Sequence, residues 1–149
     1  MFVLLRHLQR VRREAGLPRR QGSGSLAIRH VDAGSCNACE HELTAIAAPQ
    51  YDFQRFGLDL VASPRHADVL LVTGPVTKRM ERPLLTAYEA MPEPRRVAAL
   101  GDCALGCGVL ADPAELALPL DRLLPVDLRI PGCPPSPAEI SEAILELLG

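Results

Sequence analysis

The stretch Asp68-Val69-Leu70-Leu71-Val72-Thr73 decides the fold class of this chain of 149 residues. Its four central side chains are all apolar, and the next charged residue is Lys78. A continuous apolar run of this length, without the alternation of a half-exposed strand, is typical of a parallel strand buried on both faces. We therefore predict that the segment lies inside an α/β structure.

The segments on either side extend this pattern into a strand–helix alternation. Besides residues 68–73, we predict strands at residues 26–31, 58–62, 95–100 and 126–130. Helices are predicted at residues 37–47, 81–91 and 137–148. Pro83 would then fall in the first turn of its helix, where proline is tolerated. Such an alternation predicts a parallel sheet covered by helices.

The amino end differs from the rest in charge. Residues 1–24 carry six arginines and one glutamate, a net charge of +5, which leaves −7 on the remainder. Apolar side chains stand near helical spacing between the first arginines, and glycines and a proline follow. We predict a basic amphipathic N-terminal arm over residues 1–24 and an α/β domain over residues 25–149; a disordered tail is the alternative for the arm.

Composition excludes several classes of protein. The body has no basic stripe with interleaved aromatic residues, and aromatics make up only 3% of the chain, so we expect no nucleic-acid partner. The longest uncharged stretches, such as residues 69–77, are about half the roughly 18 residues of a membrane-spanning helix. Arginines interrupt the apolar amino end, which does not fit a secretory signal. We therefore expect a cytoplasmic chain with reduced thiols.

Five cysteines are grouped in three places. They occur in Gly34-Ser35-Cys36-Asn37-Ala38-Cys39, in Gly101-Asp102-Cys103-Ala104-Leu105-Gly106-Cys107 and in Pro131-Gly132-Cys133-Pro134-Pro135. Each group follows a predicted strand, and the carboxyl ends of parallel strands form the ligand crevice of an open sheet. Three loops could therefore deliver four thiolates to one site. An iron–sulfur cluster needs that number of thiolates.

The number of ligands leaves the metal open, because zinc also takes four thiolates. Zinc ribbons usually use two close pairs, and Cys103 with Cys107 could form a second pair beside Cys36 and Cys39. A zinc-stabilised structural module is therefore the alternative from another class. Glycines beside the cysteines favour the cluster, because they expose backbone N–H groups to sulfur.

These motifs resemble the small subunit of nickel–iron hydrogenases and the homologous 20 kDa subunit family of NADH–quinone oxidoreductase. The resemblance covers residues 25–148 and includes further motifs besides the cysteine loops. They are Tyr51-Asp52-Phe53-Gln54-Arg55-Phe56-Gly57, Ser63-Pro64-Arg65-His66-Ala67-Asp68, Thr73-Gly74-Pro75-Val76-Thr77 and Pro134-Pro135-Ser136-Pro137. The separated Cys36 and Cys39 and the histidine at position 66 look like the membrane-associated, formate-hydrogenlyase-type branch.

The resemblance implies a flavodoxin-like fold that holds one 4Fe–4S cluster. Carried over by motif, the ligands would be Cys36, Cys39, Cys103 and Cys133. The family commonly has glycine at position 107, so Cys107 is expected to be a spare thiol or an alternative ligand. Glu42 matches a family glutamate near the cluster and is a candidate proton relay, or else a first-turn helix residue. Glu40 is expected at the surface or at an interface.

The resemblance also implies function and partners. The chain would pass electrons to or from the active site of a nickel–iron hydrogenase-like large subunit, within a multisubunit complex that also contains a ferredoxin-like iron–sulfur subunit. The arm would contact a membrane subunit, which places the chain peripherally at the cytoplasmic face of the cell membrane. The alternative in the same class is the 20 kDa subunit of an NADH–quinone oxidoreductase-type complex, with quinone as acceptor.

Overall fold

Five parallel strands form one sheet in the order β2-β1-β3-β4-β5 in the computed structural model, which describes residues 24–108 and 113–148. The strands are β1 (Leu26–Asp32), β2 (Leu58–Leu60), β3 (Val69–Thr73), β4 (Arg96–Leu100) and β5 (Leu128–Ile130). This strand order is that of flavodoxin-like folds, so the predicted fold class is confirmed. The predicted arm, residues 1–24, lies almost wholly outside the described residues.

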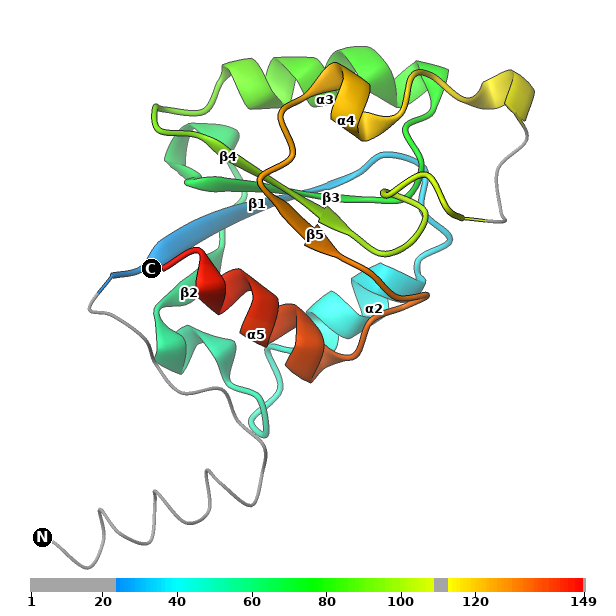
Figure 1. The fold of residues 1–149 in the computed structure, drawn as a ribbon. Coiled ribbons are helices and arrows are strands. Elements are labelled where there is room, and N and C mark those ends of the chain that lie inside the picture. The colour runs from blue at the N-terminus through cyan, green and yellow to red at the C-terminus, as the bar shows by residue number, and fades with distance from the viewer. Residues whose placement is uncertain (1–23, 109–112, 149) are drawn as a thin grey trace, which may run out of the picture.

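Helices cover both faces of the sheet (Figure 1). Helices α2 (Ala38–Ala45) and α5 (Pro137–Glu146) lie on one face, and α3 (Lys78–Glu89) and α4 (Leu120–Leu123) lie on the other. Three short 3₁₀ helices complete the elements: η1 (Phe53–Phe56), η2 (Pro64–His66) and η3 (Pro113–Glu115). None of the helices in the described ranges has the length and hydropathy of a membrane span.

The apolar run that decides the fold is the central strand. All five residues of β3 are buried, and its four apolar residues alternate between two hydrophobic cores. Val69 and Leu71 pack with α2 and α5, whereas Leu70 and Val72 pack under α3 and α4. Burial on both faces explains why this segment lacks polar alternation.

The sequence locates the five strands and the three longest helices of the described residues to within a few residues, with one clear error. Helix α3 begins at Lys78, three residues before the predicted start, so Pro83 lies inside the helix and not in its first turn. The backbone N–H of Glu81 donates to the carbonyl of Thr77 at 3.0 Å, which starts the helix early. The prediction was wrong because proline was taken as a start signal, although a buried apolar face keeps the helix continuous across it.

Candidate functional site

All three cysteine loops leave the carboxyl end of the sheet. Cys36 and Cys39 follow β1, Cys103 follows β4, and Cys133 follows β5. Because β4 and β5 are neighbours, the last two loops start side by side. Helix α2 carries Cys39 back over the sheet, where its sulfur lies 4.0 Å from the carbonyl oxygen of Leu100 at the end of β4.

The thiol of Cys39 is the buried member of the group. Burial raises its pKa to about 11, and the negative charges of Glu40 and of the Cys103, Cys36 and Cys133 thiolates raise it further. Three other thiols from three loops therefore lie close enough to act electrostatically on this one. This mutual effect is the clearest sign that the loops converge.

Cys103 shares two of these neighbours, Cys36 and Cys133. Burial raises the pKa of its thiol, and Cys133, Cys36 and Asp102 contribute in the same direction. Cys107 acts on neither Cys39 nor Cys103; it is exposed, and its sulfur lies 3.9 Å from the carbonyl oxygen of Leu105. The structure thus groups Cys36, Cys39, Cys103 and Cys133 and leaves Cys107 apart from them.

Hydrogen bonds join the loops that carry Cys103 and Cys133. The backbone N–H of Asp102 donates to the carbonyl of Gly132 at 2.9 Å, and the N–H of Gly132 donates to Asp102 Oδ1 at 2.7 Å. The N–H of Gly101 donates to Ile130 at 2.8 Å. These bonds hold the two single cysteines at a fixed spacing, as a multidentate site requires.

The first cysteine loop is held by a side-chain turn. Asp32 Oδ1 accepts the backbone N–H groups of Gly34 at 2.8 Å and of Ser35 at 2.7 Å. Asn37 then adopts a left-handed conformation, with φ of 76°, before α2 begins at Ala38. Aspartate and asparagine favour such turns because their short polar side chains bond to nearby backbone groups. The turn brings Cys36 and Cys39 to the same end of α2.

The four thiols can be compared with what a metal group requires. No three His, Cys, Asp or Glu side chains of the described residues gather tightly enough for a single metal ion. A 4Fe–4S cluster is larger than one ion and separates its four thiolates more widely. Space beside the buried sulfur exists only because residue 101 is glycine: a Cβ there would lie 2.7 Å from Cys39 Sγ. Four thiols are the number that a 4Fe–4S cluster takes, and zinc takes the same number.

A polar cluster beside the cysteines was not anticipated from the sequence. The carboxylate of Glu40, 17% exposed, accepts the hydroxyl protons of Thr73 and, at 2.7 Å, of Ser35, and lies 3.5 Å from His30 Nε2. The expectation that Glu40 lies at the surface or at an interface therefore leaves out its contacts with Thr73, Ser35 and His30. The missed signal is His30, a polar side chain on the same face of β1 as the buried Leu26 and Ile28.

The candidate proton relay Glu42 and two histidines have fewer contacts. Within the part of the chain that the structure describes, no hydrogen bond or ion pair of the Glu42 side chain is found. The ring of His41 lies 3.3 Å from Asn37 Nδ2 on the exposed face of α2, and His66 is exposed at the opposite end of the sheet. None of these three belongs to the cluster around Glu40.

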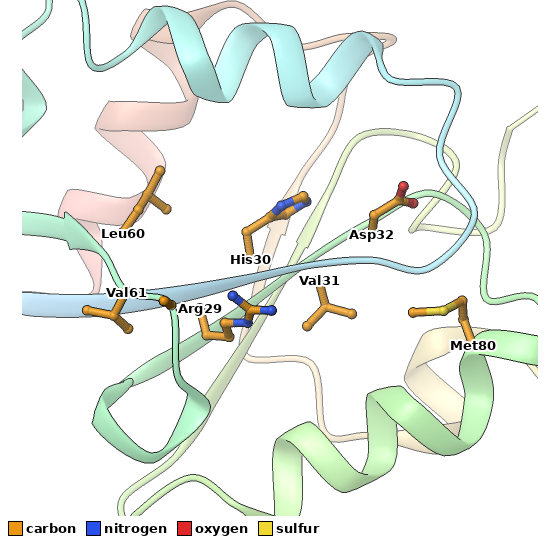
Figure 2. Close-up of a pocket in the computed structure, with 8 residues that line it drawn as sticks. Arg29, His30, Val31, Asp32, Leu60, Val61 and Met80 are labelled. Carbon is orange, nitrogen blue, oxygen red and sulfur yellow. The ribbon is translucent and has the colours of Figure 1, made fainter.

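A groove of about 520 Å³ opens beside β1, where β2 ends and leaves the edge of β1 uncovered (Figure 2). Figure 2 shows His30 and Leu60 on one side of the strand and Arg29 and Met80 on the other. Both apolar and charged side chains line the groove. His30 belongs to this lining and also contacts Glu40 in the polar cluster.

Comparison with known proteins places this fold and site in a family. Residues 36–147 match the family described as NADH ubiquinone oxidoreductase, 20 Kd subunit, and the chain belongs to it. The match covers the region of all three cysteine loops. The resemblance expected from the sequence motifs is thereby confirmed.

Within this family, the chain is similar to subunits of particular complexes. The chain is 47% identical to a probable membrane-bound hydrogenase subunit mbhJ of Pyrococcus furiosus, over 78% of this chain and 70% of that protein. It is 44% identical to formate hydrogenlyase subunit 7 of Escherichia coli, over 76% of this chain but 45% of that protein. Among solved structures, a chain of the membrane-bound sulfane sulfur reductase, an archaeal respiratory membrane complex, superposes with a TM-score of 0.71 and 34% identity, over 83% of this chain and 68% of that one.

Proposed function

We propose that this chain is the electron-transfer subunit of a multisubunit, membrane-associated nickel–iron hydrogenase-like complex of the formate hydrogenlyase type. It would carry one 4Fe–4S cluster held by Cys36, Cys39, Cys103 and Cys133. The observation that supports this most directly is the electrostatic coupling of these four thiols from three separate loops. The likeness to subunits named for membrane-bound hydrogenase and formate hydrogenlyase supports the class of complex.

The protein contributes the environment of the cluster. When bound, a 4Fe–4S cluster supplies one-electron transfer at a potential set by charge, burial and hydrogen bonds to its sulfurs. Cys39 brings one ligand into the hydrophobic core, whereas Cys36 and Cys133 are exposed. The site would therefore be shielded on the sheet side and open toward a partner. This asymmetry suits a subunit that exchanges electrons across an interface.

The partners follow from this arrangement and from the relatives. A large subunit with the nickel–iron active site would cover the exposed cysteines, and a ferredoxin-like iron–sulfur subunit would exchange electrons with it through this cluster. A membrane subunit would contact the arm, residues 1–24, whose arginines suit an anionic surface at the cytoplasmic face. Glu42 would relay protons near the interface.

Purification of the intact complex under anaerobic conditions tests the proposal. We expect a brown preparation with about four irons and four sulfides bound to this subunit, and an electron paramagnetic resonance (EPR) signal that appears on reduction. Stoichiometric zinc in a colourless subunit would support the structural module and refute electron transfer. Glu42→Gln should keep the EPR signal but slow hydrogen turnover; unchanged turnover would remove Glu42 from the proton path.

Quinone reduction is the second candidate function. The family description and the partly apolar groove beside β1 favour it, because an apolar lining with a few polar groups is typical of small-molecule sites. The co-purifying large subunit discriminates between the two functions. Two C-x-x-C pairs in it, together with bound nickel, support the hydrogenase-like complex, whereas their absence and quinone-dependent oxidation support the alternative.

A further inference from the structure

His30 heads a directional hydrogen-bonded chain that ends beside the cysteines. Its Nε2 lies 2.8 Å from Thr73 Oγ1, and Thr73 in turn donates to Glu40 Oε1. A threonine hydroxyl has one proton to donate, so that proton is committed to Glu40. His30 Nε2 must therefore carry the hydrogen in this contact. Neutral imidazole then leaves Nδ1 as the acceptor, the atom at which a proton can bind.

The charge of Glu40 links this histidine to the cysteine site. Glu40 lies 3.5 Å from His30 Nε2, and it is the largest charged contributor to the raised pKa of Cys39. It also accepts the hydroxyl of Ser35, the residue before Cys36. A positive charge on His30 would partly cancel the field of Glu40 at the cysteines. Proton binding at His30 and negative charge at the cysteine site must therefore favour each other.

We propose that His30 binds a proton when the cysteine site gains an electron and releases it when the electron leaves. The inference rests on the proposed function, since it requires a redox cluster at the four cysteines. His30 acts here as a positioning residue: it sets the electrostatic potential at the site through Glu40 and touches neither the cluster nor a substrate.

The groove beside β1 gives the proton a path to water. His30 lines this groove and its side chain is 26% exposed, so the ring is neither sealed in the core nor free in solvent (Figure 2). Three charged groups act on it: Glu40 from α2, and Asp32 and Arg29 from β1 itself. Burial lowers the pKa of His30 below its ordinary value, and Glu40 and Asp32 oppose that effect. The net lowering of the pKa favours the neutral ring.

The step balances in electrons and protons. One electron passes from the reduced iron–sulfur partner to the cluster, and one proton passes from water in the groove to Nδ1 of His30. When the electron continues to the large subunit, the proton returns to the groove. No other oxidant or reductant is needed. Lower pH should therefore favour reduction, because protonation of His30 and reduction stabilise each other.

Redox titration of the intact complex, followed by EPR at a series of pH values from 5 to 9, tests this inference. The pKa of His30 should be lower when the cluster is oxidised than when it is reduced. At pH values between these two, the equilibrium constant for reduction should approach a tenfold change per pH unit, equivalent to 59 mV for one electron. His30→Gln keeps an N–H donor for Thr73 but cannot titrate, so it should flatten this dependence. The control His66→Gln changes an exposed histidine far from the cysteines and should keep the slope.

Each outcome decides the matter. A pH-independent potential in the unsubstituted complex, or an unchanged slope in His30→Gln, would overturn the inference but leave the cluster in place. Absence of any reducible iron–sulfur signal would instead overturn the proposed function. If His30→Gln does not assemble, infrared difference spectra of the unsubstituted complex, with ¹⁵N-labelled histidine in this subunit only, take its place. A shift of imidazole bands on reduction supports the inference, and its absence refutes it.

Discussion

Replacement of Gly101 by alanine should damage the site through a single methyl group. Gly101 has a φ of 85°, in the left-handed region, and a Cβ there would lie 2.7 Å from Cys39 Sγ. The backbone conformation costs an alanine about 1–2 kcal/mol. Crowding against a buried, well-packed side chain adds about 1–3 kcal/mol. Gly101→Ala should therefore lower the free energy of unfolding by about 2–5 kcal/mol, the sum of these two costs.

Gly106 provides a matched control on the same loop. Its φ is 81°, close to that of Gly101, but a Cβ there would meet no described atom within 4 Å. Gly106→Ala should therefore pay only the backbone cost of about 1–2 kcal/mol. The difference between the two variants therefore reports the crowding around residue 101. The closest contact there is Cys39 Sγ at 2.7 Å, followed by the carbonyl oxygen of Gly132 at 3.4 Å.

Two measurements on the full chain read out this difference. Urea unfolding of the metal-free protein under reducing conditions gives the two free energies, and anaerobic reconstitution followed by iron and sulfide analysis gives the occupancy of the site. We expect lower stability and several-fold lower iron for Gly101→Ala than for Gly106→Ala. Equal losses of stability and equal iron contents would show that residue 101 does not adjoin the buried sulfur, and the assignment of Cys39 to the site would fail.

Three other predictions address the ligands, the acid–base behaviour and the last helix. Cys133→Ser should abolish most iron incorporation on anaerobic reconstitution, whereas Cys107→Ser should leave iron content unchanged; the reverse pattern would make Cys107 the ligand. Because the pKa of Cys39 is raised in the folded protein, the thiol deprotonates at lower pH in the unfolded chain than in the folded one. Its contribution to the stability of the metal-free protein should therefore be fully present below pH 9 and be lost between pH 9 and about pH 11. Chemical unfolding at several pH values checks this sign, and Cys39→Ala should reduce the decline, with the raised pKa of Cys103 accounting for what remains. Ser136→Ala deletes the bonds of the Ser136 hydroxyl to the backbone N–H and the carboxylate of Glu139, but keeps the bond from the backbone N–H of Ser136 to Glu139 Oε2. It should cost about 1 kcal/mol in urea unfolding, while iron binding by a folded chain stays intact.

The fold was accessible from the sequence because its signals are local. The apolar run at β3 specifies a strand buried on both faces, and the capping residues around Ser136 mark the start of α5. Short elements without a periodic pattern were missed, such as α4 (Leu120–Leu123) and η1 (Phe53–Phe56). One turn of helix contains too few residues to display an amphipathic repeat, so tertiary packing decides its conformation.

The site was only partly accessible for the same reason. Three cysteine groups after three strands predict convergence from topology alone, and the structure brings Cys36, Cys39, Cys103 and Cys133 into electrostatic contact. The partners of Glu40 could not be predicted, because Thr73 is 33 residues away in the sequence. No local pattern encodes a contact across two elements; only the register of β1 beside β3 places His30 on the same face as Thr73.

The same charges that favour an iron–sulfur cluster oppose the empty site. Four thiolates beside the half-buried carboxylate of Glu40 would place several negative charges in a small volume, and the pKa of Cys39, raised to about 11, shows that the metal-free protein holds this thiol protonated at neutral pH. Iron must therefore displace protons when the cluster assembles, so assembly should be favoured as pH rises. Bound iron ions would neutralise the thiolates and leave the carboxylates of Glu40, beside Cys39, and of Asp102, beside Cys103, as negative charges next to the ligands. The contact of Glu40 with the partly exposed His30 would then offer a means by which a proton compensates an added electron.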